Sequence, residues 1–279
     1  MKQTLRILLA AILAPLVLAP LVLASCSLAL GEDPSDDPLA VYDAFWSALD
    51  RDYAGFITKT SDDWDALRAQ YRETVRAAPG EVSLRSAFTD IIARLNDGHM
   101  VLYTDDGEIS LIPDYAEIPF DHEVILNNYL EDARWAASSA ILTGFLNDDT
   151  GYMWVTTFSG DGWNQSFATE LDRFASCRNL VLDVRNNGGG NSENGEALLS
   201  LFLDEDVKYG RNVFPLGPDS EPEEHDLWIH PAAKTFGSLN LFLLINEGSS
   251  STTDMVIAGL QAYTDAFTIG KPSRAELVG

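Results

Sequence analysis

Residues 179–190 read Asn-Leu-Val-Leu-Asp-Val-Arg-Asn-Asn-Gly-Gly-Gly, and this stretch decides the fold class. The segment from Asn179 to Val184 shows no polar alternation, which is typical of a strand buried on both faces of a parallel sheet. The strand ends in a polar and glycine-rich segment, where backbone N–H groups can point at a ligand and the next helix adds a partial positive charge. The stretch therefore predicts a buried parallel strand that leads into a ligand-facing loop.

Strands and helices alternate on both sides of residues 179–184. Runs of apolar and β-branched residues predict further strands, and apolar residues at helical spacing predict the helices between them. The predicted strands are 152–158, 241–245 and 267–269, and the predicted helices are 163–174, 193–203 and 252–263. Such alternation indicates an α/β core over residues 150–279, into which the polar, proline-containing residues 214–231 are inserted.

Residues 38–99 are predicted to form a helical subdomain on the N-terminal side of this core in the sequence. Apolar residues recur at helical spacing in three segments between Pro38 and Leu95. Ser61 and Ser83 are placed as the N-caps of the second and third helices, and Pro79-Gly80 separates the two. Residues 100–149 carry turn signals at 105–107 and 147–149 around short apolar runs, so we expect strands and loops in this connecting region, with hairpin turns at the two signals.

The charge of the chain limits its partners. Its 279 residues are 46% hydrophobic, which is enough for a sizeable core, and 18 Lys and Arg stand against 43 Asp and Glu. The formal net charge of −25 excludes nucleic-acid binding through a basic patch. The four histidines lack the paired helical spacing of a zinc site, so the sequence predicts neither a metal nor another cofactor.

Residues 1–25 have the pattern of a secretory signal. Two basic residues precede an apolar run from Ile7 to Leu23 that contains two prolines, which argues against a membrane-spanning helix. The run ends in Leu-Ala-Ser-Cys, which resembles the bacterial lipobox and predicts lipidation of Cys26. Cys26 would then anchor the protein at the bacterial cell envelope, on the periplasmic side or the surface, and residues 26–37 would be an acidic tether that holds the domain off the membrane. A plain signal peptide is the alternative.

Three short segments at element ends carry groups suited to catalysis. The glycine-rich loop at 186–190 lacks the Gly-Lys-Ser/Thr of a phosphate-binding loop and fits an oxyanion hole better. The segment 246–254 reads Asn-Glu-Gly-Ser-Ser-Ser-Thr-Thr-Asp, and it places hydroxyl groups at the start of a helix, where an alkoxide is favoured. Residues 96–99 read Asn-Asp-Gly-His. Taken singly, each segment also fits a purely structural role: the glycines as a tightly packed turn, the serines as a helix N-cap, and the histidine as a helix C-terminal cap.

Together the three segments resemble the tail-specific, or C-terminal processing, serine proteases. Leu95 to His99 is similar to the Leu-x-Asp-Gly-His motif of that family, Leu182 to Gly189 to its Asp-x-Arg-x-Asn-x-Gly-Gly motif, and Asn246 to Asp254 to its Asn-Glu-Gly-Thr-x-Ser-Ala-x-Glu motif. The resemblance spans roughly residues 38–279. It implies a crotonase/ClpP-like α/β protease core behind an N-terminal helical subdomain, and unfolded or C-terminal peptide segments as substrates.

The resemblance also assigns roles to residues. Ser251 falls at the nucleophile, with Ser249 and Ser250 as fallback candidates, and the oxyanion-hole N–H groups would come from Gly188 or Gly189 and from Thr252. One branch of the family uses a Ser-Lys dyad, but Glu276 stands at the lysine position and Lys271 at an unrelated turn. The other branch resembles the tricorn protease and uses a histidine, so His99 is predicted to be the general base.

Two departures from the family pattern leave other readings open. Thr252 follows the nucleophile where the family has alanine, and is expected to crowd the site. The chain stops at Gly279, before the later strands and the acid that orients the histidine, so a C-terminal truncation is expected, with Glu276 as a stand-in acid. The alternative function is a catalytically inactive, peptide- or ligand-binding surface lipoprotein. A broken remnant with an unpaired strand edge at 267–269 is the third reading.

Overall fold

The computed structural model describes residues 36–58, 63–110, 120–161, 163–216 and 220–274. These residues form two compact units. The first holds the described residues up to Asp50 and those from 63 to Ala87, and the second holds the described residues from Arg51 to 58 and from Phe88 onward. The predicted signal segment, Cys26, Ser61 and Glu276 lie outside the described residues.

The first unit is helical. It contains α2 (Pro38–Asp52), α4 (Trp64–Ala77) and the start of α5 (Glu81–Leu95). The three predicted helices are thus confirmed, and a short helix that was not predicted, α3 (Gly55–Thr58), follows α2. The core of this unit is built from aromatic and aliphatic side chains at helical spacing, which are Tyr42, Trp46, Leu49, Tyr71 and Val75.

The helix caps differ from those predicted. The side chain of Asp63 accepts a hydrogen bond from the N–H of Ala66, so Asp63 is the N-cap of α4. Ser83 was predicted to cap the third helix, which is wrong, because α5 already begins at Glu81. Its hydroxyl instead lies within hydrogen-bond distance of the carbonyl oxygens of Ala78 and Gly80, to either of which it can donate its proton. The break at Pro79-Gly80 lies between α4 and α5, as predicted.

The second unit is built on a six-stranded sheet with the order β10-β9-β6-β5-β4-β3. Four neighbouring strands run parallel, and β4 and β3 continue the sheet in antiparallel pairing. The strands are β3 (Glu131–Ala136), β4 (Ile141–Asn147), β5 (Thr150–Val155), β6 (Asn179–Asp183), β9 (Asn240–Ile245) and β10 (Phe267–Gly270). The predicted α/β class is confirmed, and β6 lies between two parallel neighbours as its sequence indicated.

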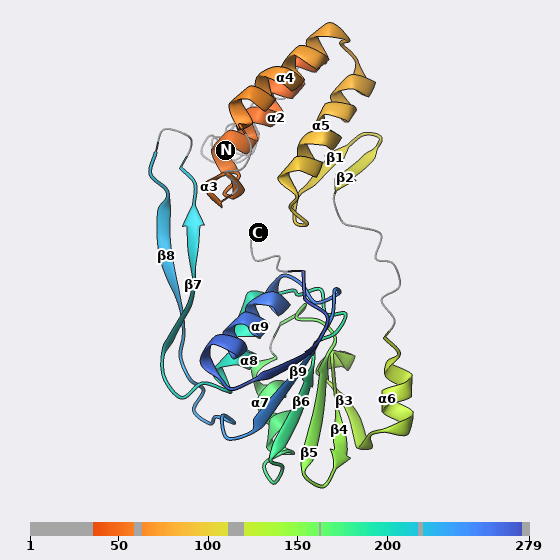
Figure 1. Cartoon of the computed structure of the whole chain (residues 1–279), viewed down its shortest axis with the longest axis vertical. Coiled ribbons are helices and arrows are strands. Elements are labelled where there is room, and N and C mark those ends of the chain that lie inside the picture. The colour runs from red at the N-terminus through yellow and green to blue at the C-terminus, as the bar shows by residue number, and fades with distance from the viewer. Residues whose placement is uncertain (1–35, 59–62, 111–119, 162, 217–219, 275–279) are drawn as a thin grey trace, which may run out of the picture. The chain divides into compact units, whose positions relative to one another are not determined.

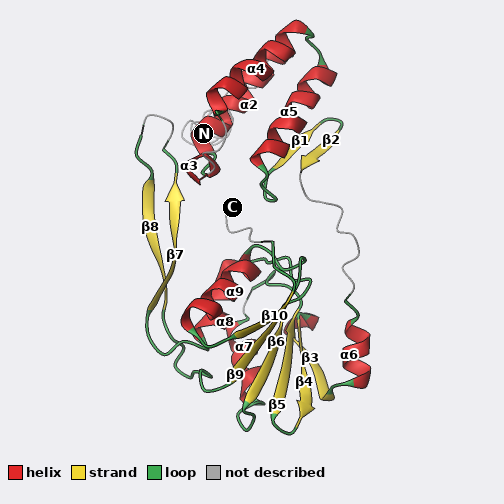
Figure 2. Cartoon of the chain, in the orientation of Figure 1, coloured by secondary structure: helices red, strands yellow, loops and turns green. Residues whose placement is uncertain are grey.

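Helices cover both faces of this sheet (Figure 1). On one face, α7 (Asn164–Asp172), α8 (Ser192–Ser200) and α9 (Thr252–Tyr263) pack on the main apolar core. On the other face, α6 (His122–Asn128) contributes Ile125 and Leu126 to a smaller cluster around Leu142, Tyr152 and Trp154. Figure 2 shows the helices and the central strands by type. Burial on both faces explains the continuous apolar sequence of β6.

The turn of one further hairpin was predicted at residues 105–107, whereas a second hairpin and α6 were not predicted. A small hairpin joins β1 (Val101–Thr104) to β2 (Gly107–Ser110), inside the region where strands and loops were expected. The second joins β7 (Val207–Phe214) to β8 (Glu223–Ile229), and β8 lies within the polar insert expected over residues 214–231. Its strands carry charged side chains that pair across the ladder, as Arg211 does with Glu224. Cross-strand charge pairs therefore replace the apolar alternation that would have indicated a strand.

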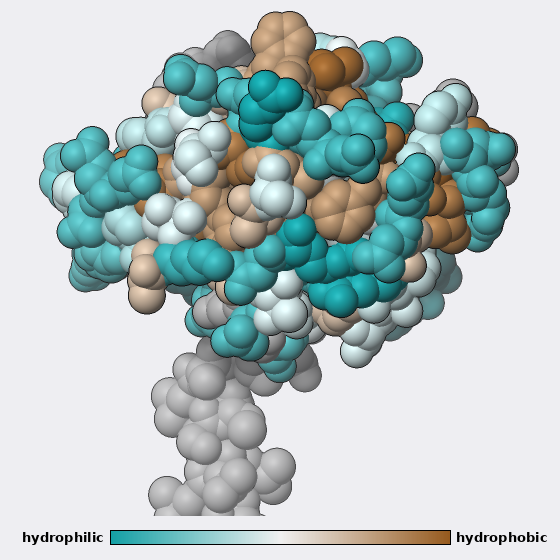
Figure 3. Space-filling view, turned by 90° about the horizontal axis from the view of Figure 1, so that it is seen from below, coloured by the Kyte–Doolittle hydropathy of each residue, from teal (hydrophilic) through white to brown (hydrophobic). Residues whose placement is uncertain are grey.

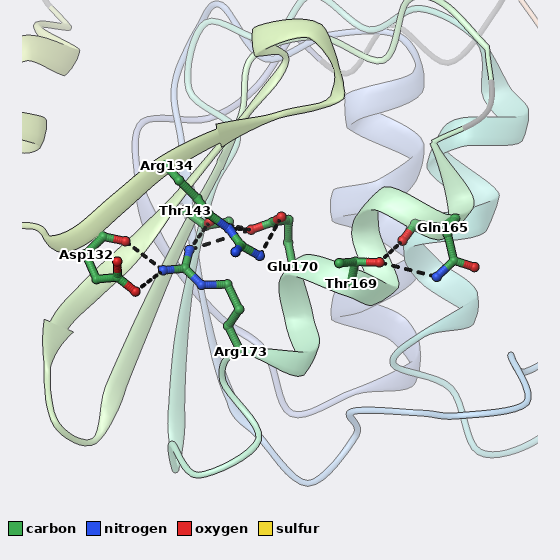
Figure 4. A network of polar contacts seen from close by, with 7 residues as sticks. All are labelled: Asp132, Arg134, Thr143, Gln165, Thr169, Glu170 and Arg173. Atoms are coloured by element: carbon green, nitrogen blue, oxygen red, sulfur yellow. Dashed lines mark hydrogen bonds and ion pairs between the residues drawn. The ribbon is translucent and has the colours of Figure 1, made fainter.

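A buried carboxylate ties the antiparallel edge of the sheet to α7 (Figure 4). The Glu170 side chain is 5% exposed and accepts hydrogen bonds from Arg134 at 2.9 Å and from Thr143 at 2.6 Å. Arg173 donates to the same threonine and to Asp132. Burial raises the pKa of Glu170, but the hydrogen bonds from Arg134 and Thr143 and the nearby arginine charges outweigh it, so the net pKa is lowered.

A cavity of about 470 Å³ lies at the amino end of β9, lined by Phe202, Asp204, Tyr263, Asp265 and Phe267 among others. Figure 3 looks onto the molecule from below the view of Figure 1 and shows hydrophobic side chains lying between hydrophilic ones. The glycine and serine motifs follow the carboxyl ends of β6 and β9, where α/β sheets bind ligands, so the cavity lies at the opposite end of the sheet from these motifs.

Within the described residues, none of the helices combines the length and apolar character that crossing a bilayer requires.

Candidate active site

Ser251 occupies a strained position between β9 and α9. It is the N-cap of α9, with φ 58° and ψ −124°, a conformation that a residue with a side chain rarely adopts. Its side chain makes no capping hydrogen bond. The backbone therefore holds the hydroxyl away from the helix end that a serine cap would satisfy. The simple capping role that the sequence left open does not describe this residue.

The hydroxyl of Ser251 meets the imidazole of His99. Ser251 Oγ and His99 Nε2 are 3.1 Å apart, although the residues are 152 positions apart in the chain. His99 follows the end of α5, and its side chain is 34% exposed. A serine whose hydroxyl lies within hydrogen-bond distance of a histidine is the arrangement that activates a serine nucleophile. The structure thus brings together the two residues predicted as nucleophile and general base.

The neighbouring serines are engaged elsewhere. The buried Ser249 hydroxyl donates to the Val184 carbonyl at 2.8 Å and accepts from the N–H of Asn246. Ser250 Oγ contacts the Gly188 carbonyl at 3.3 Å. Both side chains hold the loop to the end of β6 and the glycine segment. Among the three serines, Ser251 is the one whose hydroxyl contacts a base.

The glycine loop is anchored at its base by a buried ion pair. The carboxylate of Asp183 is fully buried and accepts hydrogen bonds from the Arg185 guanidinium and, at 2.7 Å, from the Tyr152 hydroxyl. Burial raises the pKa of Tyr152, and the negative charge of Asp183 raises it further. Arg185 also stacks over the ring of Phe120, with its guanidinium carbon 4.4 Å from the ring centroid. These contacts fix the chain where β6 ends.

The N–H groups near Ser251 differ in their availability. The Gly189 N–H donates to Asn187 Oδ1 at 2.9 Å. Among the described residues, no acceptor is shown for the N–H groups of Gly188 and Thr252, and the second of these lies at the positive end of α9. The predicted oxyanion donors are therefore reduced to Gly188 and Thr252, whereas the Gly189 N–H already has a partner.

Gly189 contributes to the site by having no side chain, which leaves room for the backbone at Ser251. Its φ of +95° favours glycine, and a Cβ there would lie 2.8 Å from Ser251 Cβ and 3.0 Å from the Thr252 nitrogen. Contacts this close are essentially never seen for a real Cβ or require the neighbour to move. Only a residue without a side chain lets the glycine loop approach the Ser251 backbone this closely.

The Thr252 side chain contacts the glycine loop and α8. Its Oγ1 donates to the Gly190 carbonyl at 2.7 Å. Its methyl group lies against α8 at Gly195, where a Cβ would be 2.7 Å from Thr252 Cγ2. The volume of the threonine side chain, which was expected to crowd the site, is thus accommodated by Gly195 on the neighbouring helix α8.

The lysine near the C-terminal end of the described chain takes no part in this arrangement. Lys271 Nζ pairs with Glu247 at 2.6 Å. This agrees with the assignment of Lys271 to an unrelated turn. Glu276, the predicted stand-in acid, lies outside the described residues.

One acid that lies near His99 was not predicted from the sequence. Asp97, two residues before His99, has a carboxylate oxygen 3.7 Å from His99 Nδ1. Its place in the Asp-Gly-His motif was the available signal.

Residues 149–278 match the sequence profile of peptidase family S41. The chain carries a peptidase family S41 domain. The S41 domain includes Ser251, the glycine loop and Thr252, whereas His99 comes from the part of the chain that precedes the matched range.

Sequence relatives of the S41 domain are similar over a short stretch. A probable CtpA-like serine protease of Staphylococcus aureus (strain bovine RF122 / ET3-1) is 30% identical over 95 residues, which cover 33% of this chain and 18% of that protein. A protein of the same description from Staphylococcus epidermidis is 28% identical over 93 residues. The matched stretch spans about a fifth of the length of these curated relatives.

Solved structures share the fold over most of the chain. A candidate peptidase from Parabacteroides merdae ATCC 43184 superposes with a TM-score of 0.73 at 22% identity, covering 86% of this chain and 76% of its own. Mature CPAF superposes with a TM-score of 0.58 at 14% identity, covering 86% of this chain and 84% of its own. Because each covers 86% of this chain, these likenesses extend the shared fold beyond the S41 domain.

Proposed function

We propose that this chain is an exported, lipid-anchored serine endopeptidase that hydrolyses peptide bonds in unfolded or C-terminal segments of proteins. Ser251 is the nucleophile and His99 the general base. The observation that carries the proposal is the 3.1 Å contact between Ser251 Oγ and His99 Nε2, at a serine with a strained backbone. The S41 family match supports the serine peptidase class.

The reaction follows from these positions. As Ser251 Oγ attacks the peptide carbonyl, His99 Nε2 takes the hydroxyl proton, and the carbonyl oxygen becomes an oxyanion. The N–H groups of Gly188 and Thr252 stabilise that oxygen, together with the positive end of α9. The peptide C–N bond then breaks as His99 returns the proton to the leaving amine, and the acyl group stays bonded to Ser251 Oγ as an ester. Water, deprotonated by His99, attacks that ester, and the C–O bond breaks as His99 returns the proton to Ser251 Oγ.

The site is tested by digestion of an unfolded protein. The full chain would be produced in a bacterial host, purified in detergent and incubated with casein, beside Ser251→Ala, His99→Ala and the matched control Ser250→Ala. We expect digestion by the parent and by Ser250→Ala, and loss of at least 100-fold in the other two. Circular dichroism checks that each variant is folded.

A folded parent that cleaves nothing would reject the endopeptidase. It would favour the alternative, a catalytically inactive lipoprotein that binds peptides, which the departure of Thr252 from the family's alanine first suggested. Retained binding of an unfolded peptide, measured by fluorescence anisotropy, would then distinguish that function from a protein that has neither role.

The proposed anchor is tested separately. Metabolic labelling with radioactive palmitate should mark the parent in the membrane fraction, and Cys26→Ala should lose the label. A parent without label that is secreted in soluble form would favour a plain signal peptide.

A further inference from the structure

We propose that Asp97 is the positioning residue for His99, and that Tyr53 in turn fixes Asp97. The inference rests on the proposed function, because it concerns the base of that site. It assigns to the segment before the S41 domain a part in preparing the base, beyond supplying His99 itself.

Asp97 contacts His99 at two points. Its Oδ1 accepts a hydrogen bond of 3.0 Å from the His99 N–H, and the same oxygen lies 3.7 Å from His99 Nδ1. The second distance is long for a hydrogen bond but close for a charge that faces the ring. The Asp97 side chain is 7% exposed, so its charge is poorly screened by water. Among the described residues, Asp97 is the carboxylate within 4 Å of a His99 ring nitrogen.

This geometry decides which ring nitrogen carries the proton. A carboxylate beside Nδ1 favours a proton on that nitrogen, which leaves Nε2 unprotonated and able to accept the Ser251 proton. After that transfer, the same carboxylate faces a positively charged imidazolium and stabilises it. Asp97 does not touch the reacting atoms and acts through His99.

Tyr53 holds the other carboxylate oxygen. Its hydroxyl donates to Asp97 Oδ2 at 2.8 Å. The ring lies over Gly55, where a Cβ would be 2.4 Å from the tyrosine oxygen, and it meets Phe56 edge-on at 5.1 Å between centroids. Burial raises the pKa of Tyr53, so the hydroxyl stays protonated and remains a donor. The absence of a side chain at Gly55 thus makes room for the ring that reaches Asp97.

The direct test is the tautomer of His99, measured by ¹⁵N NMR on the full chain with labelled histidine rings. The chain has four histidines, and His99→Gln identifies the signal of interest. We expect the neutral ring of the parent to carry its proton on Nδ1. In Asp97→Asn a much larger fraction of the population should carry it on Nε2. This readout needs no turnover, so it remains informative if the proposed protease activity is not found.

Kinetics supply the second readout. If the parent cleaves casein, Asp97→Asn should lower kcat about 100-fold with KM within about twofold, and Tyr53→Phe should lower kcat about tenfold. Asp97→Glu keeps the charge and should restore part of the lost rate. Glu223→Gln is the matched control, because it removes a carboxylate that lies 2.9 Å from His225 Nε2 on β8 and should change neither the His99 signal nor kcat.

The proposal is overturned if the His99 tautomer is the same in Asp97→Asn as in the parent. It is also overturned if Asp97→Asn only lowers the folded fraction, while the folded molecules keep the parental tautomer. Should Asp97→Asn fail to fold, Tyr53→Phe is the deciding variant. An unchanged His99 tautomer in Tyr53→Phe would overturn the proposal that Tyr53 fixes Asp97.

Discussion

Asn246 and Asn186 join the loop before α9, residues 246–251, to the glycine loop, residues 186–190, through two hydrogen bonds. Asn246 Oδ1 accepts from the Asn186 N–H at 2.9 Å, and Asn246 Nδ2 donates to Asn186 Oδ1 at 2.8 Å. The same Oδ1 accepts from the Gly248 N–H. Asn186 has a φ of 59°, so this side chain also stabilises an unfavourable backbone conformation. The loop that contains Ser251 and the glycine loop beside it are therefore linked into one structure.

We expect Asn246→Ala to destabilise the protein by about 2 kcal/mol, because it leaves the buried N–H of Gly248 and the partly buried N–H of Asn186 without their acceptor. Urea unfolding followed by circular dichroism measures the change. Asn240→Ala is the control, because Asn240 lies at the other end of β9 and its side chain contacts Asn179 at an exposed position. A loss at Asn246 no larger than the loss at Asn240 would contradict the linking role.

Gly195 and Thr252 are expected to be energetically coupled. In the parent, Gly195→Ala places a methyl group against Thr252 Cγ2 and Met255 Cε, and overpacking of this kind costs about 1–3 kcal/mol. With Thr252→Ala in place, part of that clash disappears and the cost should fall. A double-mutant cycle from unfolding free energies should give a coupling of at least about 0.5 kcal/mol. Additive effects would show that the glycine does not accommodate the threonine.

The order of the core elements could be predicted because each is specified locally. The predicted helix 252–263 coincides with α9, and the apolar run of β6 indicated burial on both faces. The β7–β8 hairpin escaped prediction because both of its faces are largely solvated, and Trp228, for example, is 52% exposed. Helix α6 is seven residues long, too short for an apolar period to be evident.

The site was predictable only in part. Motif resemblance suggested the pairing of His99 with Ser251, because no periodicity relates residues 152 positions apart. The role of Asp97 had a weak signal in its place two residues before the histidine. Nothing in the sequence distinguishes Tyr53 from the other aromatic residues of the helical region, since its contact with Asp97 exists only once the chain is folded. Likewise, that the Gly189 N–H has a partner depends on the rotamer of Asn187.

Gly189→Ala should abolish most of the proposed activity while the protein stays folded. The new Cβ would meet Ser251 Cβ at 2.8 Å at a φ of +95°, which displaces the nucleophile from His99 and from the oxyanion donors. We expect kcat on casein to fall by at least about 100-fold, as for the loss of an oxyanion donor. Gly80→Ala is the matched control, because a Cβ there meets nothing within 4 Å. Equal activity of the two variants would contradict the close approach of the loops.

The Glu170 network predicts a loss of stability in acid. The pKa of Glu170 is lower in the folded protein than its ordinary value of 4.5, so the stabilisation is present above the unfolded-state pKa and is lost as the pH falls through the folded-state pKa. Glu170→Gln should cost about 3 kcal/mol at pH 7, because it leaves Arg134 and Arg173 without the buried carboxylate. The difference in unfolding free energy between parent and variant, measured in urea from pH 7 to pH 3, should shrink below about pH 4. A difference that stays constant over this range would show that the Glu170 charge does not stabilise the fold.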